Sequence, residues 1–108
     1  MDLESECVSA LKSWAANNDS VQELWLFGSR AKGTAKPQSD VDLALILMPE
    51  TDNTNWALAK YIEDKDLWRK RLQKIVGRPI SLCAIEPGEK LFDDVMATGK
   101  RLWSRLTR

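Results

Sequence analysis

Apolar side chains form two kinds of pattern along the chain, helical spacing in some segments and short dense runs in others. From the N-terminus to about Ala16, and again from Trp56 to Val76, they recur three and four positions apart, which is typical of amphipathic helices. VQELWLF at Val21–Phe27 and VDLALIL at Val41–Leu47 are short, dense in apolar residues, and predict strands. The unbroken apolar run after Asp42 is typical of a central strand that is covered on both faces.

The C-terminal third predicts three more elements. Gly77 ends the long helix, and PISLCAI at Pro79–Ile85 predicts a third strand. Pro87 begins a short helix that Gly99 ends, and Arg101–Trp103 adds a short edge strand. This order predicts an α/β (α+β) fold, with one mixed β-sheet and helices packed mainly on one side.

The long helix carries one apolar stripe with two exceptions. Trp56 and Leu67 fall away from this stripe, where they either cap neighbouring elements or face a partner. The stripe itself consists of Leu58, Tyr61, Ile62, Trp68, Leu72 and Ile75.

Composition narrows the class of protein. With 108 residues, 44% of them apolar, the chain is expected to form a single domain over 1–108. The 16 basic residues equal the 16 acidic ones, which argues against binding to long nucleic acids and favours a charged small molecule or a protein partner. The absence of histidine excludes Ser-His-Asp triads and most zinc sites. No apolar run approaches membrane-spanning length and the N-terminus is acidic, so we expect no membrane association and a cytoplasmic location.

Two smaller groups of residues have structural interpretations. Cys7 and Cys83 lie among apolar residues, which favours small core residues over a disulfide or a metal site. Four C-terminal basic residues lack acidic neighbours and are interpreted as a solvated tail, or alternatively as an electrostatic contact with a partner. They are Lys100, Arg101, Arg105 and Arg108.

The candidate chemistry lies between the first two strands. A strand leads into Gly28-Ser29, ten residues follow, and Asp40 and Asp42 then flank the start of the next strand. A glycine there allows a sharp turn and the close approach of a phosphate, to which the next helical turn offers free amide groups. Two carboxylates one residue apart point to the same side of a strand and repel each other unless a cation lies between them. Each motif alone is usually a turn or a strand start, but together they predict a phosphate and metal site.

GSRAKG followed by SDVDLALIL resembles the signature of the polymerase-β-like nucleotidyltransferase superfamily, in its minimal nucleotidyltransferase (MNT) branch. The resemblance implies in-line attack of an acceptor hydroxyl on the α-phosphate of a nucleoside triphosphate, expected to be ATP, with release of pyrophosphate. It implies that Gly28 and Ser29 hold the triphosphate, and that Asp40 and Asp42 bind Mg²⁺ and are catalytic. Arg30 and Lys32 are candidate phosphate contacts, with surface roles as the alternative.

One position departs from the pattern of this family. Complete relatives carry a third carboxylate on the later strand, where this chain has Ser81, a neutral and weak ligand for a second metal ion. Glu86, just past that strand, either reaches the site or is an exposed or capping residue.

The resemblance also implies a partner, since short proteins of this kind resemble antitoxins paired with an all-helical HEPN protein. Three functions stay open: an enzyme that transfers AMP to such a partner, an impaired nucleotide-binding subunit that regulates it by contact, and an enzyme for a small acceptor such as an aminoglycoside. A hetero-oligomer or a homodimer is expected.

Overall fold

The computed structural model describes residues 3–34, 39–49 and 55–105, and these form one four-stranded sheet with its helices. The elements are α1 (Ser5–Ala16), β1 (Val21–Phe27), α2 (Gly28–Lys32), β2 (Val41–Leu47), α3 (Trp56–Val76), β3 (Ile80–Ala84), α4 (Lys90–Thr98) and β4 (Lys100–Ser104).

The predicted bounds of β1, β2 and α3 are confirmed, whereas α4 begins later than predicted. Pro87 does not begin the helix, because Gly88 has a φ of +96°, a left-handed conformation that interrupts a right-handed helix. The chain turns at Pro87–Gly88, and α4 starts at Lys90.

The strands lie in the order β3-β2-β1-β4. β1 is antiparallel to both β2 and β4, whereas β2 and β3 run parallel. Parallel neighbours need a long crossover connection, and α3 lies within it. The mixed sheet is confirmed, and β4 is an edge strand as predicted.

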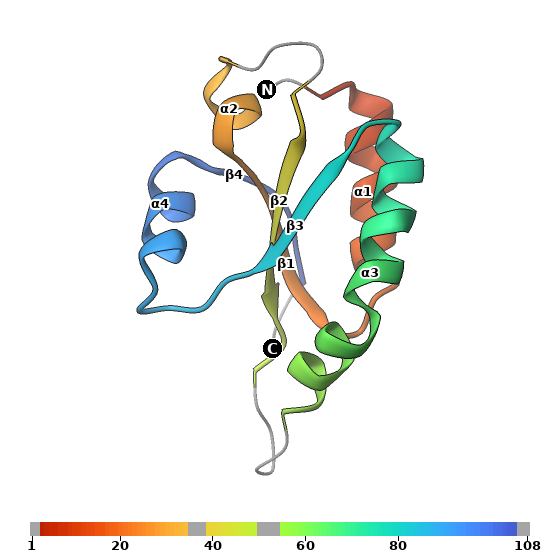
Figure 1. The fold of residues 1–108 in the computed structure, drawn as a ribbon, viewed down its shortest axis with the longest axis vertical. Helices are drawn as coiled ribbons and strands as arrows, with labels where there is room; N and C mark the ends of the chain where they lie inside the picture. The colour runs from red at the N-terminus through yellow and green to blue at the C-terminus, as the bar shows by residue number, and fades with distance from the viewer. Residues whose placement is uncertain (1–2, 35–38, 50–54, 106–108) are drawn as a thin grey trace.

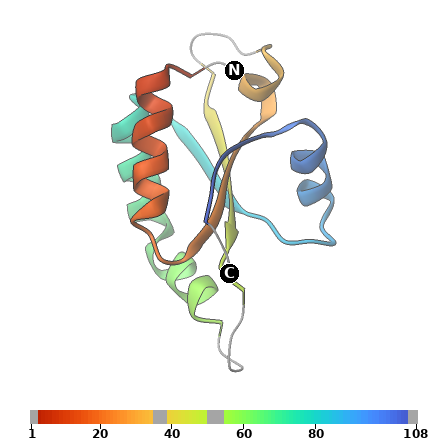
Figure 2. The same cartoon turned by 180° about the vertical axis from the view of Figure 1, so that it is seen from behind.

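The helices lie on both sides of the sheet but unequally. α1 and α3 lie next to each other against one face, while α2 and α4 lie on the other side, as Figure 1 and the reverse view in Figure 2 show. The two long helices therefore share one side, as predicted, and the opposite face has only the short helices.

Side chains of β2 alternate between two apolar clusters. Val41, Leu43 and Leu45 join the larger cluster with α1 and α3, whereas Ala44 joins a smaller one with Ile85 and Val95. All four β2 residues are fully buried, which confirms that both faces of this strand are covered. The larger cluster also contains residues of both long helices, among them Leu11, Ala15, Trp68, Leu72 and Val76.

The apolar stripe of α3 is narrower than predicted. Ile62 does not join the core, since 65% of it is exposed. Trp56 and Leu67 lie off the buried stripe as predicted, 40% and 49% exposed respectively.

The solvated-tail interpretation is wrong for Arg105. Its guanidinium donates hydrogen bonds to the carbonyl groups of Val21, Ala15 and Asn18, and it lies 4.9 Å from the ring of Trp103. Through these hydrogen bonds Arg105 holds the end of β4 against the connection between α1 and β1.

The remaining basic residues of this group differ in position. Lys100 and Arg101 are exposed on β4, and Arg108 lies outside the described residues.

Both cysteines are free and half-buried. In the described parts of the chain, no helix combines the length and apolar character needed to span a membrane.

Candidate functional site

The end of β1 turns sharply into α2. Phe27 is extended, and Gly28 has a φ of +72°, a left-handed conformation that glycine adopts without steric cost. The half-buried Ser29 follows in the first turn of α2, where backbone amides have no acceptor within the helix. Gly33, with a φ of +76°, ends the helix.

Gly28 lies directly against the carboxylate of Asp42. A Cβ on Gly28 would overlap Oδ2 of Asp42 and approach its Cγ to 3.2 Å. The contact follows from strand register, because Phe27 is paired with Asp42. The structure thus brings the two predicted motifs together, and the Asp42 carboxylate occupies the space that a side chain at position 28 would need.

Asp40 and Asp42 interact electrostatically. Asp42 is half-buried at the start of β2, and Asp40 is exposed just before it. Burial raises the pKa of Asp42, and the negative charge of Asp40 raises it further. A cation between the two carboxylates would relieve both effects.

Arg30 is buried, so the alternative of a surface role does not hold for it. Its side chain is 4% exposed and donates a hydrogen bond of 2.8 Å to the carbonyl oxygen of Ser39. This bond ties α2 to the residue that precedes Asp40, so Arg30 positions the acidic segment whether or not it also contacts phosphate. Lys32, by contrast, is exposed in the last turn of α2.

Ser81 is the partner of Asp42 on the parallel strand β3. Both residues lie on the face of the sheet opposite α1 and α3, because their neighbours Leu43 and Leu82 pack into the larger cluster. The exposed Ser81 therefore places a neutral hydroxyl next to the carboxylate.

Glu86 cannot join this site in the described structure. β3 runs parallel to β2, so Glu86 follows its far end, five residues or about 16 Å beyond Ser81. It is exposed in a turn in which the Glu89 side chain accepts a hydrogen bond from the backbone amide of Glu86. Among the described residues, no group of three or more Cys, Asp and Glu side chains could hold a metal ion.

The sequence predicted Cys83 to be a small core residue but did not show that it lies on the same face of the sheet as Asp42 and Ser81. It follows Ser81 on the same face, opposite Ala44. Burial raises the pKa of its thiol to about 11, helped by the charges of Asp42 and Glu89. Cys83 is therefore a neutral thiol at physiological pH. The alternation of β3 is the signal that placed it beside Ser81.

Solved structures with the same fold include toxin–antitoxin chains. The chain superposes with a TM-score of 0.66 on a protein of a toxin–antitoxin complex with AMP-PNP, at 24% identity over 94% of this chain and 75% of that one. A chain of the MntA–HepT toxin–antitoxin complex gives 0.58 at 21% identity, covering 93% and 71%. A complex of a tri-AMPylated Shewanella oneidensis HEPN toxin with its MNT antitoxin gives 0.55 at 20% identity, covering 93% and 71%. These likenesses establish the fold.

Sequence comparison gives the family. No curated protein matches the chain, but the family model "Polymerase beta, Nucleotidyltransferase" matches residues 9–108. The match contains Gly28, Ser29, Asp40 and Asp42, so the resemblance stated from the sequence is confirmed at this level. The chain belongs to the polymerase-beta nucleotidyltransferase family.

Proposed function

We propose that this chain binds Mg²⁺–ATP at Gly28, Ser29, Asp40 and Asp42 and transfers AMP to a hydroxyl group of a HEPN-type protein partner. The observation that carries the proposal is the contact between Gly28 and the Asp42 carboxylate, beside the negative charge of Asp40. A glycine lets the backbone approach a phosphate closely, and the carboxylate beside it forms with Asp40 a charge pair that a divalent cation stabilises.

In this reaction the acceptor oxygen bonds to the α-phosphorus while the bond from that phosphorus to the β-phosphate oxygen breaks. Pyrophosphate leaves, and the hydroxyl proton passes to solvent, since Ser81 is too weak a base to take it. Gly28 and the first amides of α2 would hold the triphosphate, and Arg30 would keep the segment before Asp40 in place.

The residues present fit a magnesium ion. Asp40 and Asp42 would hold it, because hard carboxylate oxygens are the ligands that Mg²⁺ shares with phosphates. When bound, Mg²⁺ neutralises the charge that develops on the phosphate oxygens.

The HEPN-type partner is proposed from the structural neighbours. Three of them are chains of toxin–antitoxin complexes, one with AMP-PNP and one with an AMPylated HEPN toxin. The nucleotide in one of those complexes corresponds to the proposed substrate, and the AMPylated toxin in another corresponds to the proposed product.

A second function is supported by the position of Ser81. With a serine beside Asp42, the described residues supply no third carboxylate to the site, and Glu86 lies at the wrong end of β3 to do so. In this alternative the chain binds nucleotide and regulates its partner by contact, without transferring AMP.

Transfer to the partner separates the two functions. Wild-type chain, Ser81→Asp and Asp42→Asn are incubated with Mg²⁺, ATP labelled on the α-phosphate and the purified partner, and label in the partner and released pyrophosphate are measured. We expect slow transfer by the wild type, a rate at least about tenfold higher for Ser81→Asp, and none for Asp42→Asn.

The other results are equally informative. No transfer by either the wild type or Ser81→Asp, although the complex forms and ATP binds, would favour the regulatory subunit. Equal rates for the wild type and Asp42→Asn would exclude the proposed site.

A further inference from the structure

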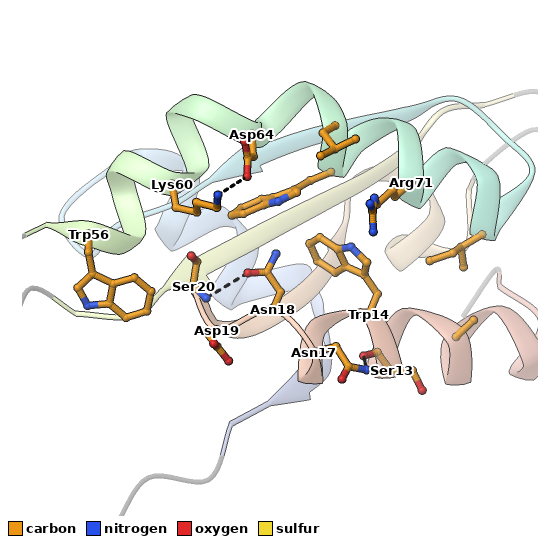
Figure 3. A pocket seen from close by; sticks show the side chains of 14 residues that line it. Ser13, Trp14, Asn17, Asn18, Asp19, Ser20, Trp56, Lys60, Asp64 and Arg71 are labelled. Atoms are coloured by element: carbon orange, nitrogen blue, oxygen red, sulfur yellow. Dashed lines mark hydrogen bonds and ion pairs between the residues drawn. The ribbon is translucent and has the colours of Figure 1, made fainter.

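A groove of about 860 Å³ lies between α1 and α3, on the face of the sheet opposite Asp42. The two helices are close where Sγ of Cys7 lies 3.9 Å from the carbonyl oxygen of Ile75. Toward the N-terminus of α3, the groove is bordered by Trp56 and by the connection from α1 to β1, as Figure 3 shows.

The groove has an aromatic floor and exposed apolar edges. Trp14 and Trp68 meet edge to face, with ring centroids 5.9 Å apart. The edges carry Trp56 and Leu67, which are 40% and 49% exposed although most large apolar side chains of α3 are buried or half-buried. Large exposed apolar side chains at the rim of a groove with an aromatic floor favour a macromolecular contact.

The charges of the groove differ between its two ends. Asp19 lies at the end that also holds Trp56, and the exposed Arg71 lies toward the other end. Lys60 lies near the Trp56 end, where its ammonium is paired with Asp64 at 2.9 Å, so this ion pair adds no net charge. The end charges therefore suit a ligand that is basic at one end and acidic at the other.

The shape suits a helix. A concave trough between two helices accepts a third, convex element, and helix-in-groove binding uses an apolar stripe for such a contact. Trp56 and Arg71 are fifteen residues apart on α3, or about 22 Å at a rise of about 1.5 Å per residue, which is the length of about four helical turns.

We infer that this groove docks an amphipathic helix of the protein partner, with basic residues near Asp19 and acidic residues near Arg71. The existence of a HEPN-type partner rests on the function proposed above. The groove lies on the side of the sheet opposite the nucleotide site, so a partner docked here must extend around the edge of the sheet for its acceptor hydroxyl to reach that site.

The test uses matched apolar variants of α3. Leu67→Asp places a charge in the groove, whereas Ile62→Asp places the same charge on the same helix at an exposed residue outside the groove lining. Each 108-residue chain is co-expressed with the HEPN-type partner. Affinity for the partner, affinity for Mg²⁺–ATP and the melting temperature are then measured.

We expect Leu67→Asp to weaken the partner complex at least about tenfold, and Ile62→Asp to leave it unchanged. Both variants should bind Mg²⁺–ATP like the wild type. In a second measurement, a photo-crosslinking residue at position 67 should crosslink to a helix of the partner, and one at position 62 should not.

Three outcomes would overturn the inference. Equal binding of the partner by both variants, without crosslinks from position 67, would remove the groove but leave the proposed function intact. Absence of any wild-type complex would remove the partner itself. A wild-type chain that dimerises alone, and that Leu67→Asp makes monomeric while Ile62→Asp does not, would assign the groove to a second copy.

Discussion

The two faces of β2 differ in physical character at the start of the strand, around Asp42. Val41, Leu43 and Leu45 point toward α1 and α3 and are fully buried, whereas Asp42 points away from them, against Gly28 and beside Ser81. The apolar row stabilises the strand. The opposite row holds a carboxylate whose ionised form is disfavoured by burial and by the charge of Asp40. The comparison shows how a small domain can hold a partly buried carboxylate in position. The apolar side chains on the other face of the same strand pack into the core and fix the strand.

The largest expected effect is on the apolar row. Leu43→Ala should lower the free energy of unfolding by about 3 kcal/mol, because it removes buried methyl groups and leaves a cavity at a fully buried position. Chemical denaturation measures the change. Ser81→Ala, on the other face and exposed, should change it by less than about 0.5 kcal/mol. Similar losses for the two variants would contradict the division between the faces.

Arg30 should have the next largest effect. Arg30→Ala removes a buried hydrogen bond from a charged donor to Ser39, at a cost of about 2 kcal/mol. Because that bond ties α2 to the segment before Asp40, Mg²⁺–ATP affinity should fall as well. Lys32→Ala, exposed on the same helix, is the matched control for stability and should change the free energy of unfolding little. An Arg30→Ala chain that unfolds like the control would refute the positioning role.

Alanine substitutions at Gly28 and Gly33 distinguish the effect of backbone strain from that of a steric clash with Asp42. Gly28 and Gly33 have φ angles of +72° and +76°, so alanine at either position should cost about 1–2 kcal/mol of stability. A Cβ at Gly33 meets nothing within 4 Å, whereas one at Gly28 collides with the Asp42 carboxylate. Only Gly28→Ala should therefore weaken Mg²⁺–ATP binding, as measured by calorimetry. Equal binding by both variants would mean that the close approach of Gly28 to the Asp42 carboxylate plays no part in Mg²⁺–ATP binding.

The smallest effect concerns the pH dependence of Asp42. Its pKa is raised in the folded chain, so the folded state binds this proton more readily than the unfolded state does. Ionisation of Asp42 therefore destabilises the fold, and its contribution to stability falls as the pH rises from 3.8 through the raised pKa. In EDTA, Asp42→Asn should be slightly more stable than the wild type at pH 7, and the difference should vanish below pH 3.8. Denaturation curves across this range would contradict the account if the difference did not depend on pH.

The fold was predictable because its signals are local. β1 and β2 are short runs dense in apolar residues, α3 carries an apolar stripe at helical spacing, and the turn residues beside them limit their ends. The start of α4 was not predictable, since it depends on the left-handed conformation of Gly88 rather than on apolar spacing. The exposure of Ile62 also depends on tertiary packing, which the helical wheel does not contain.

The candidate site was predictable where its parts are close in sequence. Gly28 and Asp42 flank one connection, so two strands that pair directly bring them together. The sequence did not decide whether Glu86 reaches the site, because its position depends on the direction of β3 relative to β2. The burial of Arg30 likewise follows from the tertiary arrangement of α2 against β1 and β2, which no local pattern shows.

Calorimetric titration of the chain with ATP tests the central claim most directly. The account predicts binding that requires Mg²⁺, is lost in EDTA, and is weakened at least about tenfold in Asp42→Asn, because one of two ligands of the ion is then neutral. The melting temperature of the variant in EDTA should match or exceed that of the wild type, which excludes unfolding as the cause. Equal affinity of wild type and Asp42→Asn for ATP, with or without Mg²⁺, would contradict the assignment of this site.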